Sequence, residues 1–195
     1  MKHKQIVHMV TLSLLTTIVV VLQLLGGSIM ISGVSVTLVL VPIVVGASIY
    51  GVKDGAFLGA VFGLITFINC MRHNSPFEGM LFDASPWFCG LVCMVKATAA
   101  GYVAALVQKL LYKWKSKGLL SYMGAAIAAP VVNTAIFACG MILFFRDAMN
   151  GFFGDTKFMY NLFVLVIGVN FFAELAVNLI CAPAIATIVK AAKKN

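Results

Sequence analysis

The chain has 195 residues, of which 62% are hydrophobic and only 10% are charged, and its mean hydropathy is +1.05. Soluble domains carry about 25% charged residues, so this composition excludes an ordinary soluble protein and predicts an integral membrane protein. The formal net charge is +8, but the basic residues gather at the ends of apolar segments, which indicates membrane topology and argues against a nucleic-acid partner.

We predict an all-α integral membrane protein: one membrane domain, residues 1–195, folded as a single bundle of six transmembrane helices. A span needs about 20 apolar residues, and the predicted spans cover about 6–25, 36–50, 56–70, 87–109, 119–145 and 158–189. Lysines dominate the ends that we assign to the cytoplasm, whereas the opposite ends carry Arg72, Arg146 and Lys157. This bias predicts that both termini are cytoplasmic.

The first span, 6–25, carries small hydroxylated side chains one helical turn apart, among them Ser13 and Thr17. Faces made of small residues let membrane helices approach closely. Two uses remain open for this face: packing within the bundle, or docking onto another membrane subunit.

The second and third spans carry backbone signals. Pro42 lies within 36–50 and is expected to kink that helix. Glycines recur at every fourth position from the turn before the third span onward, at Gly51, Gly55, Gly59 and Gly63. Such a ladder predicts intimate contact with a neighbouring helix and a scaffold role.

The segment 71–86 mixes polar and apolar residues, including Asn74 and Phe77. A purely solvated loop would not need the apolar residues, so we expect this segment to fold back over the bundle as a lid. In the span 87–109, Cys89 and Cys93 are expected to be packing residues. Lys96 lies roughly 14 Å past the start of the same span at 1.5 Å per residue, so it should face a cavity or an acid.

Isolated polar residues mark the last two spans. Asn133 lies near the middle of 119–145, and Asn170, Glu174 and Asn178 recur every fourth residue in 158–189, which places them on one helical face. An acid in the hydrocarbon costs roughly 2.5–3.5 kcal/mol. Lys96 and Glu174 therefore form either a structural ion pair or part of a pocket for a small polar or anionic ligand.

Signals for catalysis are missing from the sequence. The three histidines lie outside the middle of the predicted spans, and the motifs of serine hydrolases, zinc proteases and phosphate-binding loops do not occur. We predict a protein that binds its ligand without transforming it, with no catalytic residue, no metal and no cofactor of its own. An intramembrane enzyme is disfavoured for the same reason.

Several motifs resemble the S components of energy-coupling-factor (ECF) vitamin transporters. They are Val41-Pro42, Gly46-Ala47, the run Gly51 to Phe67 with its Asp54-Gly55 turn, Asn74-Ser75-Pro76, Pro130 to Asn133, and Asn170, Glu174 and Pro183. Within that family, the Asp54-Gly55 turn, Thr66-Phe67 and the Asn170/Glu174 pattern are most similar to the pantothenate branch.

The resemblance implies a vitamin-binding subunit in the bacterial plasma membrane. Its partners would be membrane lipid, the transmembrane coupling subunit EcfT and two ECF ATPase subunits, which would hydrolyse the ATP. EcfT would dock at Ser13 and Thr17, although the family carries alanines there. The substrate-binding residues would be Lys96, Asn133, Asn170, Glu174 and Asn74.

Two alternatives remain open at this point. The first is an S component for another vitamin or precursor, such as hydroxymethylpyrimidine, pyridoxine, riboflavin, cobalamin or folate. The second is a proton-coupled secondary carrier that uses Glu174 as its proton site. An internal repeat would favour that carrier, and we find none in the sequence.

Overall fold

The computed structural model describes residues 2–26, 30–31, 34–35, 38–114, 119–153, 160 and 168–194. Among these, only the backbone is described at residues 2–3, 26, 30–31, 34–35, 152–153, 169–170, 190 and 192–194. Its elements follow one another along the chain. They are α1 (Lys2–Gly26), β1 (Met30–Ile31), β2 (Val34–Ser35), α2 (Leu40–Tyr50), α3 (Val52–Met71), α4 (Pro76–Ala84), α5 (Pro86–Lys113), α6 (Leu119–Phe144), α7 (Arg146–Phe153) and α9 (Val169–Lys194).

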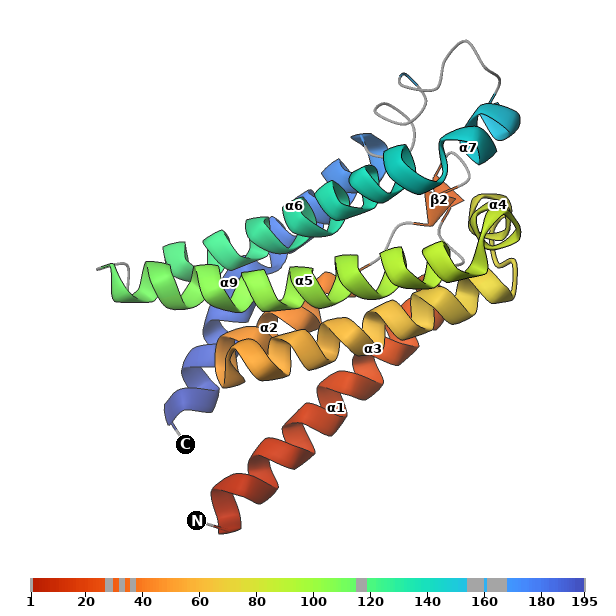
Figure 1. The fold of residues 1–195 in the computed structure, drawn as a ribbon. Helices are drawn as coiled ribbons and strands as arrows, with labels where there is room; N and C mark the ends of the chain where they lie inside the picture. Colours follow the sequence, from red (N-terminus) through yellow and green to blue (C-terminus); the bar gives the residue numbers. More distant parts are fainter. Residues whose placement is uncertain are drawn as a thin grey trace.

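The long helices form one bundle with two distinct ends (Figure 1). Both chain termini lie toward one end, which we call the terminal end. The short helices α4 and α7 lie at the other, which we call the cap end. The β1–β2 hairpin, an antiparallel pair with Met30 opposite Ser35, also lies there.

The structure confirms a helical fold. Five helices in the described part of the chain, α1, α3, α5, α6 and α9, are long and apolar enough to cross a membrane. The predicted second span corresponds to α2, which has only 11 residues. At 1.5 Å per residue this is about 16 Å, short of a hydrocarbon core of about 30 Å, so the count of six spans stays a prediction.

The short helix α2 forms the centre of the bundle. It contacts α1, α3, α5, α6 and α9, and eight of its residues are buried. Its sequence is almost continuously apolar because it has no solvent face. Pro42 lies in the first turn, where proline replaces no intrahelical donor, so the physical reason for the kink predicted in this helix is absent.

Three glycines of α3 let its backbone touch that of α5, as the glycine ladder predicts. A methyl group on each would collide with a backbone carbonyl oxygen of α5, in the pairs Gly55–Gly101, Gly59–Ala97 and Gly63–Cys93. Gly51 serves differently: it ends α2 with a φ of 98°, a conformation that residues with a Cβ rarely adopt.

Replacing Gly59 with alanine is expected to destabilise the protein, because the new methyl would force the α3 and α5 backbones apart. Overpacking of this kind costs about 1–3 kcal/mol. Thermal unfolding in detergent checks it, with Gly151→Ala as the control, since a methyl at Gly151 meets nothing within 4 Å. An unchanged Tm for Gly59→Ala would contradict the close packing of these helices.

The segment 71–86 does fold back over the bundle, as the predicted lid, and it does so as the helix α4. Ser75 caps the helix by accepting a hydrogen bond from the backbone N–H of Glu78, with Pro76 in the first turn. Phe77 and Leu81 are buried in a core shared with α5 and α6. The Ser-Pro-Phe-Glu sequence already carries a helix-start pattern.

Candidate functional site

A buried amide–carboxylate pair joins α6 to α9. Nδ2 of Asn133 donates a hydrogen bond to Oε2 of Glu174 at 3.4 Å, and only 4% of Asn133 and 1% of Glu174 is exposed. One turn further along α9, Nδ2 of Asn178 donates to the backbone carbonyl of Glu174 at 2.8 Å. Two of the predicted site residues therefore meet, on the polar face of α9 that the sequence indicates.

The same pair of helices contains buried acceptors that lack donors. Within the described part of the chain, the Oδ1 atoms of Asn133 and Asn178 are buried and accept no hydrogen bond. A buried acceptor without a hydrogen bond costs about 1–3 kcal/mol of folding free energy. Native proteins rarely contain such acceptors. A hydroxyl or amide N–H group could donate a hydrogen bond to either of these oxygens.

Lys96 approaches α6 from α5. Its Nζ lies 4.6 Å from the centroid of the Phe137 ring, a cation–π geometry. Phe137 and Asn133 are four residues apart on α6 and so share a face. The salt bridges between described side chains lie at the two ends of the bundle, so a Lys96–Glu174 ion pair is not formed in this structure.

Phe137 also connects Lys96 to α4. Phe77 is a buried residue of α4, and its ring centroid lies 6.2 Å from the ring centroid of Phe137. A chain of contacts thus runs from α4 through two aromatic rings to the ammonium group of Lys96. Displacement of α4 would therefore disturb the packing around that charge.

Two predicted site residues are not joined to this group. Asn74 lies in the turn between α3 and α4 with an exposed side chain, and its backbone N–H donates to the carbonyl of Asn69. Asn170 belongs to α9, but its side chain lies outside the described ones. A role of either side chain in binding stays a prediction.

A second buried polar group, which was not predicted from the sequence, joins α1 to α3. Nε2 of Gln23 donates to Oγ1 of Thr66 at 3.1 Å, and Nδ2 of Asn69 donates to the backbone carbonyl of Gln23 at 3.3 Å. Oε1 of Gln23 and Oδ1 of Asn69 are buried acceptors without a donor among the described residues. Gln23 and Asn69 are isolated amides in apolar runs, the signal that identified Asn133.

The small residues of α1 lie on its outer surface. Ser13 and Thr17 are exposed, and the Thr17 hydroxyl donates to the backbone carbonyl of Ser13 at 3.0 Å. Only 11% of the apolar window of α1 is buried in the bundle, the smallest share among the five candidate spans in the described part. Of the two uses left open, packing of these side chains within the bundle is therefore not observed.

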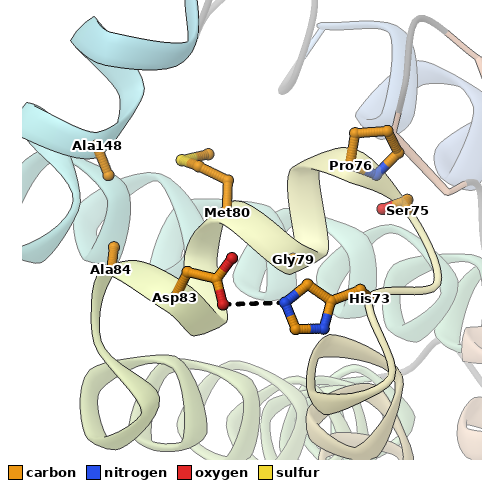
Figure 2. Close-up of a pocket in the computed structure, with 8 residues that line it drawn as sticks. All are labelled: His73, Ser75, Pro76, Gly79, Met80, Asp83, Ala84 and Ala148. Carbon is orange, nitrogen blue, oxygen red and sulfur yellow. Dashed lines mark hydrogen bonds and ion pairs between the residues drawn. The ribbon is translucent and has the colours of Figure 1, made fainter.

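A hollow of about 650 Å³ opens at the cap end beside α4. Figure 2 shows that its wall includes Met80 and Asp83 of α4, His73 from the preceding turn, and Ala148 of α7. Nε2 of His73 and Oδ1 of Asp83 are 2.9 Å apart. This pair ties the turn before α4 to the last turn of α4.

The hydrogen bond to the Asp83 carboxylate raises the pKa of His73 above 6.5. The pair therefore stabilises the fold fully below the unfolded pKa of histidine, and this contribution is lost as the pH rises through the raised value. In an NMR titration, Asp83→Asn should return the pKa of His73 toward 6.5. An identical titration in both proteins would show that the pair does not form.

Comparison with known proteins gives two matches. Residues 7–186 match the family described as ECF transporter, substrate-specific component. The chain is also similar to the pantothenic acid transporter PanT of Lactococcus lactis subsp. cremoris (strain MG1363), with 28% identity over 171 residues, covering 82% of this chain and 80% of the relative.

The matched family is one of transport proteins and not of enzymes, which agrees with the absence of catalytic motifs in the sequence. Its match covers α2 to α7 completely, together with most of α1 and α9. The chain therefore belongs to the family of ECF transporter substrate-specific components.

Proposed function

We propose that this protein is the membrane-embedded subunit of an ATP-driven ECF importer that captures pantothenate from outside a bacterial cell. The membership of the chain in the substrate-specific component family carries the proposal. The match to a pantothenic acid transporter supports the choice of substrate, and the polar group around Glu174 supports the presence of a binding site within the bundle.

The chemistry of pantothenate suits the residues of the site. Its carboxylate would pair with the ammonium of Lys96, while its hydroxyl and amide N–H groups would donate to the unsatisfied amide oxygens and to the carboxylate of Glu174. Asn170 and Asn74 would contribute from α9 and from the turn before α4. The binding site would need no cofactor.

The partners would follow from the same function. EcfT and two ECF ATPase subunits would supply the energy, since the described part of the matched region consists of the helices of one bundle and a short hairpin and contains no nucleotide-binding domain. We further propose six spans with both termini in the cytoplasm, which would place the terminal end inside and the cap end outside, where the ligand arrives.

Native mass spectrometry of the detergent-purified chain tests this function. A retained molecule with the mass of pantothenate would support both the role and the substrate. Another vitamin would keep the role and overturn the substrate. If no vitamin of a full panel binds the purified chain, the proposal is wrong.

Lys96→Ala is expected to weaken pantothenate binding by at least about tenfold, because a charge-assisted hydrogen bond contributes about 1.5–3 kcal/mol. Isothermal titration calorimetry would measure the change. Lys109→Ala is the matched control, since Lys109 is exposed on the same helix near its other end. Unchanged affinity in a folded Lys96→Ala protein would remove Lys96 from the site.

A further inference from the structure

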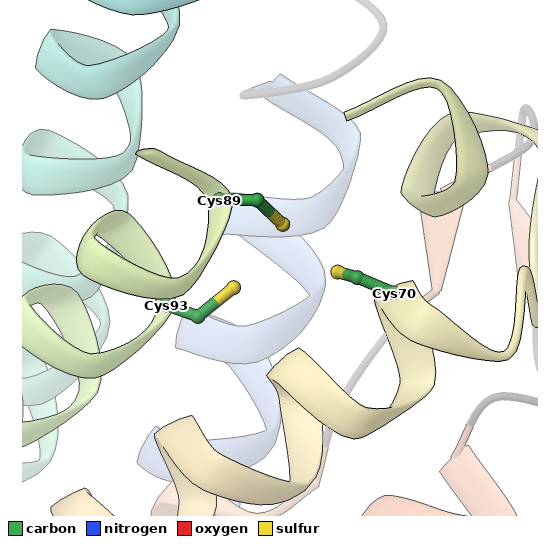
Figure 3. Close-up of side chains that lie close together, drawn as sticks. All are labelled: Cys70, Cys89 and Cys93. Atoms are coloured by element: carbon green, nitrogen blue, oxygen red, sulfur yellow. The ribbon is translucent and has the colours of Figure 1, made fainter. Parts of the chain in front are cut away.

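Three buried thiols converge at the cap end of the bundle (Figure 3). Cys70 lies in the last turn of α3, and Cys89 and Cys93 lie one turn apart at the start of α5. Their three Sγ atoms all lie within 4.8 Å of one another. The expectation that Cys89 and Cys93 serve only packing rests on two thiols, whereas the structure adds a third from another helix.

We propose that Cys70, Cys89 and Cys93 form a binding site for a soft, thiophilic cation, and that Cu(I) is the ion it fits best. Sites made of sulfur alone select soft ions such as Cu(I) or Zn(II). Structural Zn(II) takes four ligands in a tetrahedron, whereas the cluster of the described residues supplies three. Cu(I) accepts three sulfur ligands in a plane.

The spacing of the thiols suits such an ion. A metal–sulfur bond of about 2.3 Å places three sulfurs around a trigonal ion about 4.0 Å apart. The observed separations, all within 4.8 Å, need only small rotations of the side chains to reach that value. The backbones of α3 and α5 already touch beside this cluster, because Gly63 lies against the carbonyl of Cys93.

The surroundings would hold a soft ion and exclude water. The thiols belong to a buried apolar core that includes Phe77 and Leu81 of α4 and the thioether side chains of Met141 and Met149. Sulfur-rich, apolar surroundings favour Cu(I) over harder ions, which need oxygen or nitrogen ligands.

Lys96 compensates part of the charge of the loaded site. The ligands of a metal ion are thiolates, so when Cu(I) binds, the three thiols release their protons to solvent, and the ion with its ligands carries a net charge of −2. Lys96 lies three residues after Cys93, on the same side of α5, and its ammonium contacts Phe137, which packs against this core. The positive charge of Lys96 therefore offsets one of the two negative charges in the buried region, which lowers the cost of burying the loaded site.

Anaerobic titration of the full-length, detergent-purified chain with Cu(I), in competition with a chromogenic Cu(I) chelator, tests the site. We expect one Cu(I) per chain, a thiolate-to-copper charge-transfer absorption, and a higher Tm in the loaded protein, because the ion would link α3 to α5. Cys70→Ser should weaken binding by more than about tenfold, since even outer-shell partners are typically worth 10–100-fold in metal affinity.

The chain offers matched controls. Cys139 is exposed and Cys181 is partly buried, and Cys139→Ser and Cys181→Ser should keep the affinity of the wild-type protein. In the unmodified protein under mildly denaturing conditions, bound Cu(I) should slow the alkylation of Cys70, Cys89 and Cys93 relative to the Cu(I)-free protein but leave Cys139 equally reactive in both. This second measurement needs no variant to fold.

Three results would overturn the proposal. They are failure of the reduced wild-type protein to take up Cu(I), equal weakening by Cys139→Ser and Cys70→Ser, and stoichiometric binding of Zn(II) in preference to Cu(I). A protein that takes up no Cu(I) but forms a Cys70–Cys89 or Cys70–Cys93 disulfide in air would assign the cluster to redox chemistry instead.

Discussion

Glu174→Ala is expected to lower the affinity for pantothenate by roughly 100-fold in the isolated subunit, the largest loss that we expect from a single side chain. Two effects add. The carboxylate is the strongest acceptor in the buried group, and hydrogen bonds to charged groups are worth about 1.5–3 kcal/mol, where 2.7 kcal/mol corresponds to about 100-fold. Its removal also takes away the acceptor for Nδ2 of Asn133, which would disorder the neighbouring amide.

Glu174→Gln separates binding from proton coupling. The amide keeps the shape of the side chain and an oxygen for Asn133, so binding should fall by only about tenfold, the loss of one charge-assisted bond. Thr187→Ala, an exposed substitution on the same helix, should leave the affinity unchanged. Normal binding in both Glu174 variants, with uptake that has lost its dependence on a proton gradient, would instead favour a proton-coupled carrier.

The sequence predicts those residues of the site whose membrane-insertion cost depends only on their own position in the chain. Lys96, Asn133 and Glu174 are conspicuous because each is a polar residue in an apolar run, and membrane insertion penalises each without reference to its neighbours. Gln23 and Asn69 carry the same signal and could have been found in the same way. Their pairing across α1 and α3, however, depends on how the helices are rotated.

Contacts made by ordinary apolar residues cannot be predicted in this way. Phe137 is one of 15 phenylalanines, and its position beneath Lys96 and against Phe77 follows from how α5, α6 and α4 pack. The cysteine cluster is hidden for the same reason, because Cys70 and Cys89 come from different helices. The glycine ladder was the exception: its four-residue repeat predicted close packing, although not that α5 would be the partner.

Helix lengths mark another limit of the sequence. The ends of α3, α5 and α6 lie within four residues of the predicted spans, because glycine, proline and basic residues bound the apolar runs. The segment 36–50 is apolar for a different reason: α2 is surrounded by five helices, and complete burial in protein produces the same composition as contact with lipid. Hydropathy alone does not distinguish these two surroundings.

Simultaneous replacement of Ser13 and Thr17 with leucine is expected to abolish pantothenate uptake by the assembled transporter while sparing binding by the isolated subunit. Both side chains are exposed on α1, and the exposed apolar residues around them, such as Val10 and Leu14, provide area for a partner helix. Close helix packing in membranes depends on small residues at the contact. Two leucines would hold the partner backbone several ångströms away, so the coupling subunit should no longer co-purify.

The comparison that decides this prediction is Ala135→Leu, which adds similar bulk at an exposed position of α6. If lipid alone covers both helices, the leucines on α1 and on α6 should be equally harmless, because the hydrocarbon accommodates either. Loss of uptake and of co-purification only in the α1 variant would assign the small face of α1 to docking. Retention of uptake in both proteins would place the coupling subunit on another face, and α1 would then owe its exposure to lipid.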